Sequence, residues 1–443
     1  MHEALPIFIS SIADILDQAV SWIWLLMPIW LTAVLMPLAW DMWVRYARFR
    51  WQSTRKYCVL EIKIPQETFK SPAAMELVLN ALIQTGGEGT PHERYWTGKS
   101  RPWASLELAV INGEVHFFIW CFENQKNFLT ANIYAQYPDV AVHEVEDYTK
   151  EVSRNLETKY DVWACQYDLV KPISYPIKTY IDYGLSEDPD EEFKVDPLVS
   201  LLEVLGTTNK EDQIWFQFMA RAHVAEKNIF NKSTPDPWVL SAKKEIQKII
   251  DEASVERVEV TESGKTIKTL VPAQAKMTTE KKDLIDALSR SIAKYPLDAG
   301  VRCIQVYPKG EAGHIRRDVI KGAFRQFGST TLNNIKPDDQ DYNYYWQDPA
   351  YYFKIPFMKP RNWRLGQHIF KCYCMRSYFF YPYNHGTHLP FLPWGVKSHH
   401  KPNMVLNTEE LATLYHFPGS TAKVPALKRI PSKRATAPAN LPT

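Results

Sequence analysis

This chain of 443 residues contains few cysteines and has little net charge. Its 52 lysine and arginine residues face 50 aspartate and glutamate residues, so the formal net charge is only +2. A chain this close to neutral has no overall electrostatic field that would attract nucleic acid or an acidic surface, so any basic binding site must be a local cluster of residues. Six cysteines are too few for a secreted disulfide framework, so we expect reduced and mostly buried thiols. The length and the 45% hydrophobic content predict two or three folded domains.

Two catalytic signatures are also missing. The segment Thr97-Gly98-Lys99-Ser100 has the end of a phosphate-binding loop, but position 93 is Glu where that loop needs glycine. It also precedes an expected strand, whereas a phosphate-binding loop must open a helix. No G-x-S-x-G nucleophile elbow occurs, and no Ser-His-Asp arrangement is visible. We therefore predict no cofactor and no catalysis, with a stand-alone enzyme as the minor hypothesis.

Charge is absent from one long run, residues 19–40, with the sequence AVSWIWLLMPIWLTAVLMPLAW. At ~1.5 Å rise per residue, such a helix reaches about 30 Å, the thickness of the hydrocarbon core. A cleaved signal peptide is the alternative, but the run is too long and lacks a basic n-region and an A-x-A site. A single transmembrane helix is predicted over 19–43. Its anchoring indole rings are those of Trp22, Trp24, Trp30, Trp40 and Trp43.

The two flanks of this run differ in charge. Acidic residues precede it, whereas five cations follow within one short stretch: Arg45, Arg48, Arg50, Arg55 and Lys56. The positive-inside rule then places the bulk of the chain in the cytoplasm and the anchor in the inner (cytoplasmic) membrane. The same basic residues are able to contact anionic headgroups of the lipid bilayer.

Residues 57–148 show strand and helix signals in the order β-α-β-β-α-β. Strands are predicted at 57–65, on both sides of the turn pair Asn112-Gly113, and at 140–148. Ser71 followed by Pro72 is typical of a helix start, and a second helix is expected around 128–138. This order indicates a ferredoxin-like split βαβ unit.

A second unit of the same kind is expected after it, with a charged helix and a hairpin around Ser263-Gly264 as an insertion. Its predicted strands cover 161–170, 176–184, 213–224 and 301–308, and its helices begin at Pro197 and at Thr278 or Thr279 and also cover 314–327.

The predicted fold class is therefore α+β, with an N-terminal transmembrane helix, two ferredoxin-like units and an aromatic, proline-rich C-terminal segment. In chain order the segments are an outer amphipathic segment (1–18), the transmembrane helix (19–43), a basic juxtamembrane collar (44–56), the first ferredoxin-like domain (57–155), a second α+β domain (156–335) with an insertion at about 225–276, an aromatic-rich packing segment (336–420) and a basic proline-rich tail (421–443).

The C-terminal part contains three groups of candidate site residues. The aromatic segment either packs against the folded domains or forms a partner surface. Its residues His368, Cys372 and Cys374 have the types of a zinc site, but their spacing favours buried thiols over a metal. Candidate partner-docking residues of the tail are Lys423, Lys428, Arg429, Lys433 and Arg434. Candidate nucleic-acid contacts, a minor hypothesis, are Arg316, Arg317, Lys359, Arg361 and Arg364.

Long strings of the sequence resemble an uncharacterised bacterial family of membrane-anchored proteins. In that family the corresponding region precedes, in one chain or in a neighbouring gene, a HerA/FtsK-like ATPase of conjugative DNA transfer by type IV secretion. The matching strings are LEIKIPQETFKSPAAMELVLNAL (60–82), ERYWTGKSRPWASLEL (93–108), EVHFF (114–118), IYAQYPDVAVHEVEDY (133–148), RQFGSTTLN (325–333), VLNTEELATLYHFPG (405–419) and RIPSKRATAPANLP (429–442).

The resemblance implies an anchor and adaptor whose motor is a separate HerA/FtsK-like ATPase. In fused members the ATPase domain follows a segment like RIPSKRATAPANLP, whereas this chain stops at Thr443. The expected function is thus a non-enzymatic membrane anchor and adaptor in a type IV secretion or conjugation-like system. Its expected partners are the lipid bilayer, the ATPase and further copies of the chain. The alternative is a membrane-tethered module that binds single-stranded nucleic acid.

Overall fold

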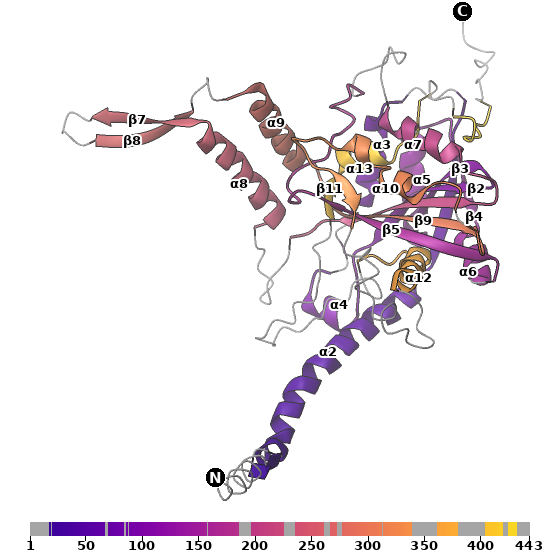
Figure 1. Cartoon of the computed structure of the whole chain (residues 1–443), viewed down its shortest axis with the longest axis horizontal. Helices are drawn as coiled ribbons and strands as arrows, with labels where there is room; N and C mark the ends of the chain where they lie inside the picture. The colour runs from indigo at the N-terminus through magenta and orange to yellow at the C-terminus, as the bar shows by residue number, and fades with distance from the viewer. Residues whose placement is uncertain are drawn as a thin grey trace, which may run out of the picture.

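The computed structural model describes the chain in fourteen stretches (Figure 1). They are residues 17–18, 20–66, 70–83, 86, 88–156, 158–185, 196–225, 235–260, 266–272, 277–311, 313–338, 361–379, 404–419 and 424–431. Their architecture is mixed α+β, with helices around an antiparallel sheet and one apolar helix near the N-terminus.

One antiparallel sheet forms the centre of the described molecule. Its strands lie in the order β10-β5-β9-β6-β2-β3-β1-β4, and β11 pairs with the first residues of β9. The strands are β1 (Tyr57–Lys63), β2 (Trp103–Ile111), β3 (Glu114–Phe122), β4 (Ala141–Val145), β5 (Tyr160–Leu169), β6 (Gln213–Ala222), β9 (Pro296–Pro308), β10 (Ile335–Pro337) and β11 (Met404–Asn407).

The two halves of this sheet have matching strand orders. The run β4-β1-β3-β2 in one half corresponds to β10-β5-β9-β6 in the other, and every pair of neighbours is antiparallel. The halves join where β2 pairs with β6, in a register that runs from Trp103↔Arg221 to Val110↔Ile214. One backbone ladder therefore continues across the whole sheet.

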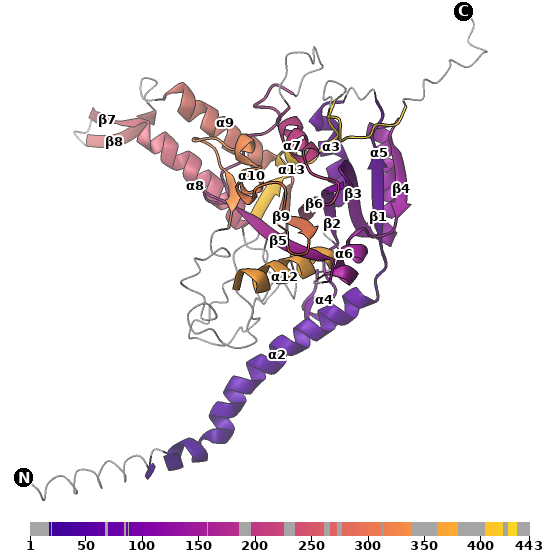
Figure 2. The same ribbon diagram turned by 45° about the vertical axis from the view of Figure 1, so that its right-hand side comes forward.

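Helices cover both faces of the sheet (Figures 1 and 2). Residues of α3, α5, α7 and α13 contribute to the larger hydrophobic core, whereas α6 and α12 contribute to a second core on the opposite face. The helices of these layers are α3 (Pro72–Leu79), α5 (Glu123–Gln136), α6 (Thr149–Asn155), α7 (Pro197–Gly206), α10 (Arg317–Lys321), α12 (Arg361–Cys374) and α13 (Thr408–Leu414), with 3-10 turns at Asn80–Leu82 and Arg325–Phe327.

Several element boundaries follow from local chemistry that the sequence displays. The Ser71 side chain accepts a hydrogen bond from Ala73 N at the start of α3, and Pro72 occupies the first turn. Asn112 and Gly113 have φ values of 55° and 79°, as the tight turn between β2 and β3 requires. These predicted features are confirmed.

Two predicted elements are wrong. Residues 176–184 form turns instead of a strand, because backbone N–H groups there donate to side chains: Ile177 N to Glu410 and Tyr180 N to Thr413. No ladder partner is needed once those donors are satisfied. The expected helix over 314–327 is limited to α10 and a 3-10 turn, with Gly322 ending α10.

The segment between β6 and β9 extends away from the sheet. Helices α8 (Pro237–Glu252) and α9 (Thr279–Ala293) flank the hairpin of β7 (Ser254–Val260) and β8 (Thr266–Pro272). Figures 1 and 2 show this hairpin at the outer end, far from the sheet. We call residues 237–294, from the start of α8 to the C-cap residue of α9, the arm, and the rest of the α+β structure the body.

Helix α2 (Met27–Ser53) extends from the body on another side (Figure 2). It is long and apolar enough to cross a membrane, and its side chains up to residue 40 are mostly exposed. Its last three turns differ, because Val44 and Ala47 are buried against the body. α2 therefore combines a protruding apolar half with a half that is packed on the fold.

Candidate functional site

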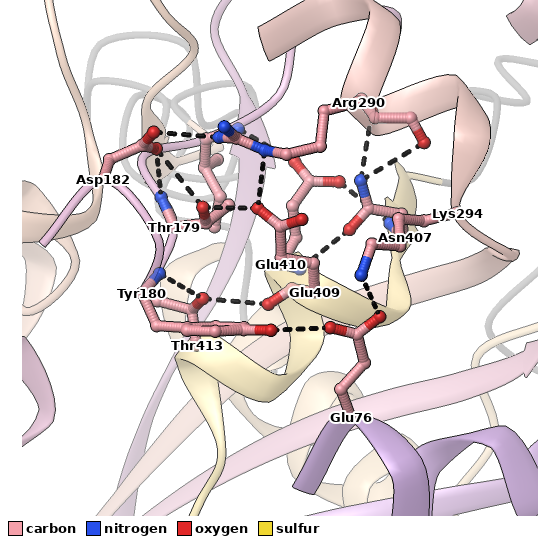
Figure 3. Close-up of polar contacts among 12 residues, drawn as sticks. Glu76, Thr179, Tyr180, Asp182, Arg290, Lys294, Asn407, Glu409, Glu410 and Thr413 are labelled. Carbon is pink, nitrogen blue, oxygen red and sulfur yellow. Dashed lines mark hydrogen bonds and ion pairs between the residues drawn. The ribbon is translucent and has the colours of Figure 1, made fainter. Parts of the chain in front are cut away.

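Four carboxylates, three of them buried, gather where the base of the arm meets the body (Figure 3). Helix α13 supplies two glutamates, α3 supplies one, and the segment 177–185 supplies an aspartate, while α9 contributes Arg290 and the residue that caps its C-terminus, Lys294, contributes a second cation. We call this group the arm joint. It consists of Glu76, Asp182, Arg290, Lys294, Glu409 and Glu410.

Glu410 is fixed by the start of α13. Its backbone N–H donates to the Asn407 side chain at 2.8 Å, and its carboxylate accepts the Asn407 N–H at 2.8 Å. This reciprocal pair is a capping box, written in the sequence as Asn-Thr-Glu-Glu. The second carboxylate oxygen accepts Ile177 N–H at 2.8 Å. Burial nevertheless outweighs these bonds and raises the pKa of Glu410 to about 8.

Glu409 meets the arm directly. Its Oε1 lies 3.2 Å from Nε of Arg290 and accepts the Thr179 hydroxyl at 2.5 Å. Nη2 of the same arginine lies 2.8 Å from Oδ1 of Asp182, so one guanidinium bridges two carboxylates. Burial raises the pKa of Glu409 despite these contacts.

Glu76 forms the second link between arm and body. Lys294 Nζ lies 2.7 Å from Glu76 Oε1, and the Thr408 hydroxyl donates to the same oxygen at 3.1 Å. The Tyr180 hydroxyl donates to Oε2 at 2.8 Å, and burial together with this bond raises the pKa of Tyr180. Every carboxylate of the arm joint thus contacts a cation or hydrogen-bond donors, an arrangement that holds elements together.

A second buried ionic group lies under α12 on the other face of the sheet. Arg376 is bidentate to Glu107, with both nitrogen–oxygen distances 3.0 Å, and it also pairs with Asp147. The Gln217 amide donates to Glu107 at 2.8 Å. These contacts attach the chain after α12 to β2 and β6, and the two carboxylates hold the pKa of Arg376 above its usual value against the effect of burial.

A third group lies at the end of β6 and the start of β9. Asp298 contacts Arg221 at 2.8 Å, His223 at 2.6 Å and Arg101 at 3.5 Å. Burial disfavours the charged carboxylate, but these cations outweigh burial and lower the pKa of Asp298 to about 2. The contact with Asp298 likewise raises the pKa of His223 above its usual value although burial lowers it.

The predicted anchoring tryptophans fall into two sets. Trp22, Trp24 and Trp30 are exposed on the protruding part of the N-terminal helix. Trp40 and Trp43 instead contact the body: the Trp40 ring lies 5.7 Å from that of Tyr95, and Trp43 Nε1 donates to the Tyr95 carbonyl at 3.0 Å.

The basic collar is the C-terminal part of α2 and the residues after it. Arg45 pairs with Asp41 at 2.8 Å, one helical turn away, and Arg48 is half-buried against the body. Arg50, Arg55 and Lys56 are exposed.

The predicted docking tail is described only in part. Lys428 pairs with Glu114, and the Arg429 guanidinium donates to carbonyl groups that include Gly419 at 2.6 Å and Pro65 at 3.2 Å. Neighbouring Ile430 donates its backbone N–H to the Ile64 carbonyl and accepts the Gln66 N–H, directly after the end of β1. Residues 424–431 therefore pack on the body, while Lys423, Lys433 and Arg434 lie outside the described residues.

The predicted nucleic-acid contacts are only partly described. Arg316 is exposed and pairs with Asp318 at 3.1 Å, whereas Arg317 contacts the Tyr307 hydroxyl at 3.4 Å. Lys359 lies outside the described residues, and Arg361 and Arg364 lie on α12, where their side chains are not described.

The candidate zinc-ligand residues His368, Cys372 and Cys374 all lie on α12. Cys372 Sγ is 3.6 Å from His368 Nε2 on α12, and burial raises the pKa of Cys372. Among the residues that the structure describes, no group of three or more potential metal ligands is found.

Sequence reasoning missed the arm joint entirely. The one available signal was the capping-box pattern at 407–410, since it places two adjacent glutamates at the start of an apolar helix. Arg290 and Lys294 lie more than 100 residues along the chain from the carboxylates that they contact, and no spacing in the sequence connects them.

Comparison with known proteins adds no relative. No family model matches the chain, and neither a curated protein nor a solved structure matches it. The class is therefore set by the fold: an α+β protein with an antiparallel sheet and an N-terminal helix that qualifies by length and composition as a membrane span.

Proposed function

We propose that this protein is a single-pass inner-membrane anchor and adaptor for a separate HerA/FtsK-like ATPase in a type IV secretion or conjugation-like system. Support for the anchor comes from α2. Large apolar side chains such as Ile29, Leu35 and Met36 are exposed on several sides of it, and a helix that is apolar all round requires an apolar environment. The basic residues that follow the span favour a cytoplasmic body.

The proposed fold assignment is two ferredoxin-like units. The orders β4-β1-β3-β2 and β10-β5-β9-β6 support it, because each has the strand sequence 4-1-3-2 with antiparallel neighbours. The arm then occupies the connection between the second and third strands of the second unit. An insertion at a hairpin connection leaves the parent sheet intact, so it is a suitable place for a partner-binding element.

The observation that carries the adaptor function is the arm itself. It extends from the body, and its base is secured by ion pairs of Arg290 with Glu409 and Asp182 and of Lys294 with Glu76. A rigidly based protrusion presents its outer end to a partner at a defined orientation. The ATPase as that partner is taken from the sequence resemblance, and the tail residues 432–443 are a second candidate contact.

The test is affinity purification of the full-length protein from its native membrane in mild detergent, followed by mass spectrometry. We expect a HerA/FtsK-like ATPase at stoichiometric yield. Replacing residues 254–272 by a short Gly-Ser linker is expected to remove the ATPase, whereas Arg316→Ala, an exposed change on the body, retains it. Recovery of a homogeneous homo-oligomer without an ATPase from the unmodified chain contradicts the adaptor function.

A further inference from the structure

The described surface has an aromatic patch where α2 enters the body. Trp96, from the loop after α4 (Pro91–Tyr95), is 53% exposed. On the exposed side of α2, Met42, Trp43 and Tyr46 are exposed as well. We call these four residues the entry patch. All four lie beyond the uncharged run that ends at Trp40: Met42 and Trp43 stand at the end of the predicted span 19–43, whereas Tyr46 and Trp96 lie outside it, so the span alone does not account for the patch.

The body is rigidly attached to α2 at this level. Gly98 has a φ of 66°, and a Cβ atom there would lie 2.2 Å from the backbone of Ala47. The loop and the helix are thus in contact with no room for a side chain. Val44, on the same side of α2, is fully buried. Because the contact is this close, the depth of the entry patch relative to a membrane is fixed by α2.

The position of Trp96 relates it to the end of the span. Its ring centroid lies 5.3 Å from that of Trp40 and 6.0 Å from that of Trp43. The headgroup layer adds about 5–8 Å on each side of the hydrocarbon core, by the difference between ~30 Å and ~40–45 Å. With Trp40 at the boundary of the core, Trp96 falls inside this layer.

Residue chemistry at the patch fits the same layer. Tryptophan and tyrosine are the side chains enriched at membrane interfaces, because one end is apolar and the other polar. The exposed cations Arg50, Arg55 and Lys56 follow on the same stretch of chain, and their sign matches anionic headgroups. If a second copy of this chain bound to the patch instead, the same cations of the two copies would come close together and repel each other.

We propose that the entry patch inserts into the headgroup layer of an anionic bilayer, so that the body is held flat against the membrane surface and not suspended below it on a free helix. The inference rests on the proposed membrane anchor, and it adds a contact between the body and lipid. Trp96 is its key residue, since it belongs to the body and not to α2.

Depth-dependent fluorescence quenching of the full-length protein tests this contact. An environment-sensitive fluorophore is attached to the new thiol of a Trp30→Cys, Trp96→Cys or Phe128→Cys variant, and the labelled protein is placed in vesicles of phosphatidylcholine and phosphatidylglycerol. Phe128 on α5 is the matched control, because it is also 53% exposed but lies on another part of the body. The unmodified chain, whose described cysteines are buried or half-buried, gives the labelling background. The same label on a Tyr46→Cys variant repeats the measurement on α2 and leaves the loop that carries Trp96 unaltered.

We expect a headgroup-labelled quencher lipid to quench positions 96 and 46 several-fold more than position 128, with blue-shifted emission. Equal quenching at 96 and 128 overturns the inference. Protection of position 96 from aqueous iodide without quenching by lipid also overturns it, because a protein then covers the patch. A second quencher lipid, labelled near the end of its acyl chain, is read at position 30, which lies near the middle of the span, and separates the two failures. Acyl-chain quenching at 30 without headgroup quenching at 96 leaves the anchor intact, whereas no acyl-chain quenching at 30 removes the anchor and this contact together.

Discussion

Arg290 of α9 and Glu409 of α13 lie 3.2 Å apart across the joint between arm and body, although 119 residues separate them in the chain. The same guanidinium reaches Asp182 at 2.8 Å. One side chain of the arm thereby connects two separate segments of the body, which makes Arg290 the position at which arm attachment is most directly tested.

Arg290→Ala is expected to lower the free energy of unfolding by about 1–3 kcal/mol, because it leaves the Glu409 carboxylate buried without its cation. Urea denaturation followed by circular dichroism measures the loss. Arg316→Ala is the control: its side chain is 82% exposed, and such a surface pair contributes at most about 1 kcal/mol. In the double variant with Glu409→Gln, the loss should be smaller than the sum of the single losses. Strict additivity would contradict the pairing.

The pH dependence of stability is expected to depend on Glu410. Its pKa is about 8 in the fold and about 4.3 in an unfolded chain, so the folded state holds the extra proton between these values. The free energy of unfolding therefore falls as the pH rises from about 5 to 8, by up to about 1.4 kcal/mol per pH unit. The raised pKa values of His223 and His416 also make the free energy of unfolding fall as the pH rises. The contribution of Glu410 must therefore be measured as a difference between the unmodified protein and a variant.

Glu410→Gln provides that difference. The amide stays neutral, so its free energy of unfolding should decline less steeply between pH 5 and 8 than that of the unmodified protein. The variant gives up one acceptor for the backbone N–H groups of Ile177 and Asn407, and it should be less stable than the parent at pH 5. Urea midpoints at several pH values report both effects. Parallel pH profiles for the two proteins would show that Glu410 is not the proton-binding group.

Arg376→Met is expected to destabilise the protein by about 3–5 kcal/mol, because Glu107 and Asp147 are then buried without their cation. Arg376→Lys keeps the charge but loses the bidentate geometry, so its cost should be smaller. Thermal unfolding of the two variants side by side gives the comparison. Equal melting temperatures for Met and Lys would indicate that charge compensation at this site is unimportant.

Truncation after Pro431 separates the two roles considered for the tail. It retains the segment that packs on the body, including the Arg429 contacts, and removes Lys433 and Arg434. We expect an unchanged urea midpoint together with weaker retention of the ATPase. Arg429→Ala should instead lower the midpoint, since its bonds to backbone carbonyls are lost. A truncation that leaves ATPase retention intact removes these residues as docking contacts.

Nucleic-acid binding is the alternative function, and its signature is a steep dependence on salt, because phosphate contacts release counterions. The adaptor function predicts that the full-length protein does not retain a single-stranded oligonucleotide at physiological salt. Retention that falls steeply with salt and weakens in Arg316→Ala would instead favour the alternative. A gel-shift titration at two salt concentrations distinguishes the two.

Local elements of this fold were predictable where the residues responsible are adjacent in sequence. The turn at Asn112-Gly113 and the helix start at Ser71-Pro72 are examples. The wrong strand at 176–184 has the opposite origin, since its N–H groups bond to side chains of α13 more than 200 residues later. The pairing of β2 with β6, which joins the two halves of the sheet, could not be predicted from the sequence. Each strand is apolar enough to pair with several others, so tertiary packing determines which pair forms.

The β2–β6 junction also has a mechanical consequence. The arm is inserted between β6 and β9, and α2 leads into β1. A pull by a partner on the arm thus reaches α2 from β6 across three interstrand ladders, β6–β2, β2–β3 and β3–β1, and from β9 across these three and the β9–β6 ladder. The sheet therefore transmits a force on the arm to α2 with little deformation, because many backbone hydrogen bonds between the strands share the force.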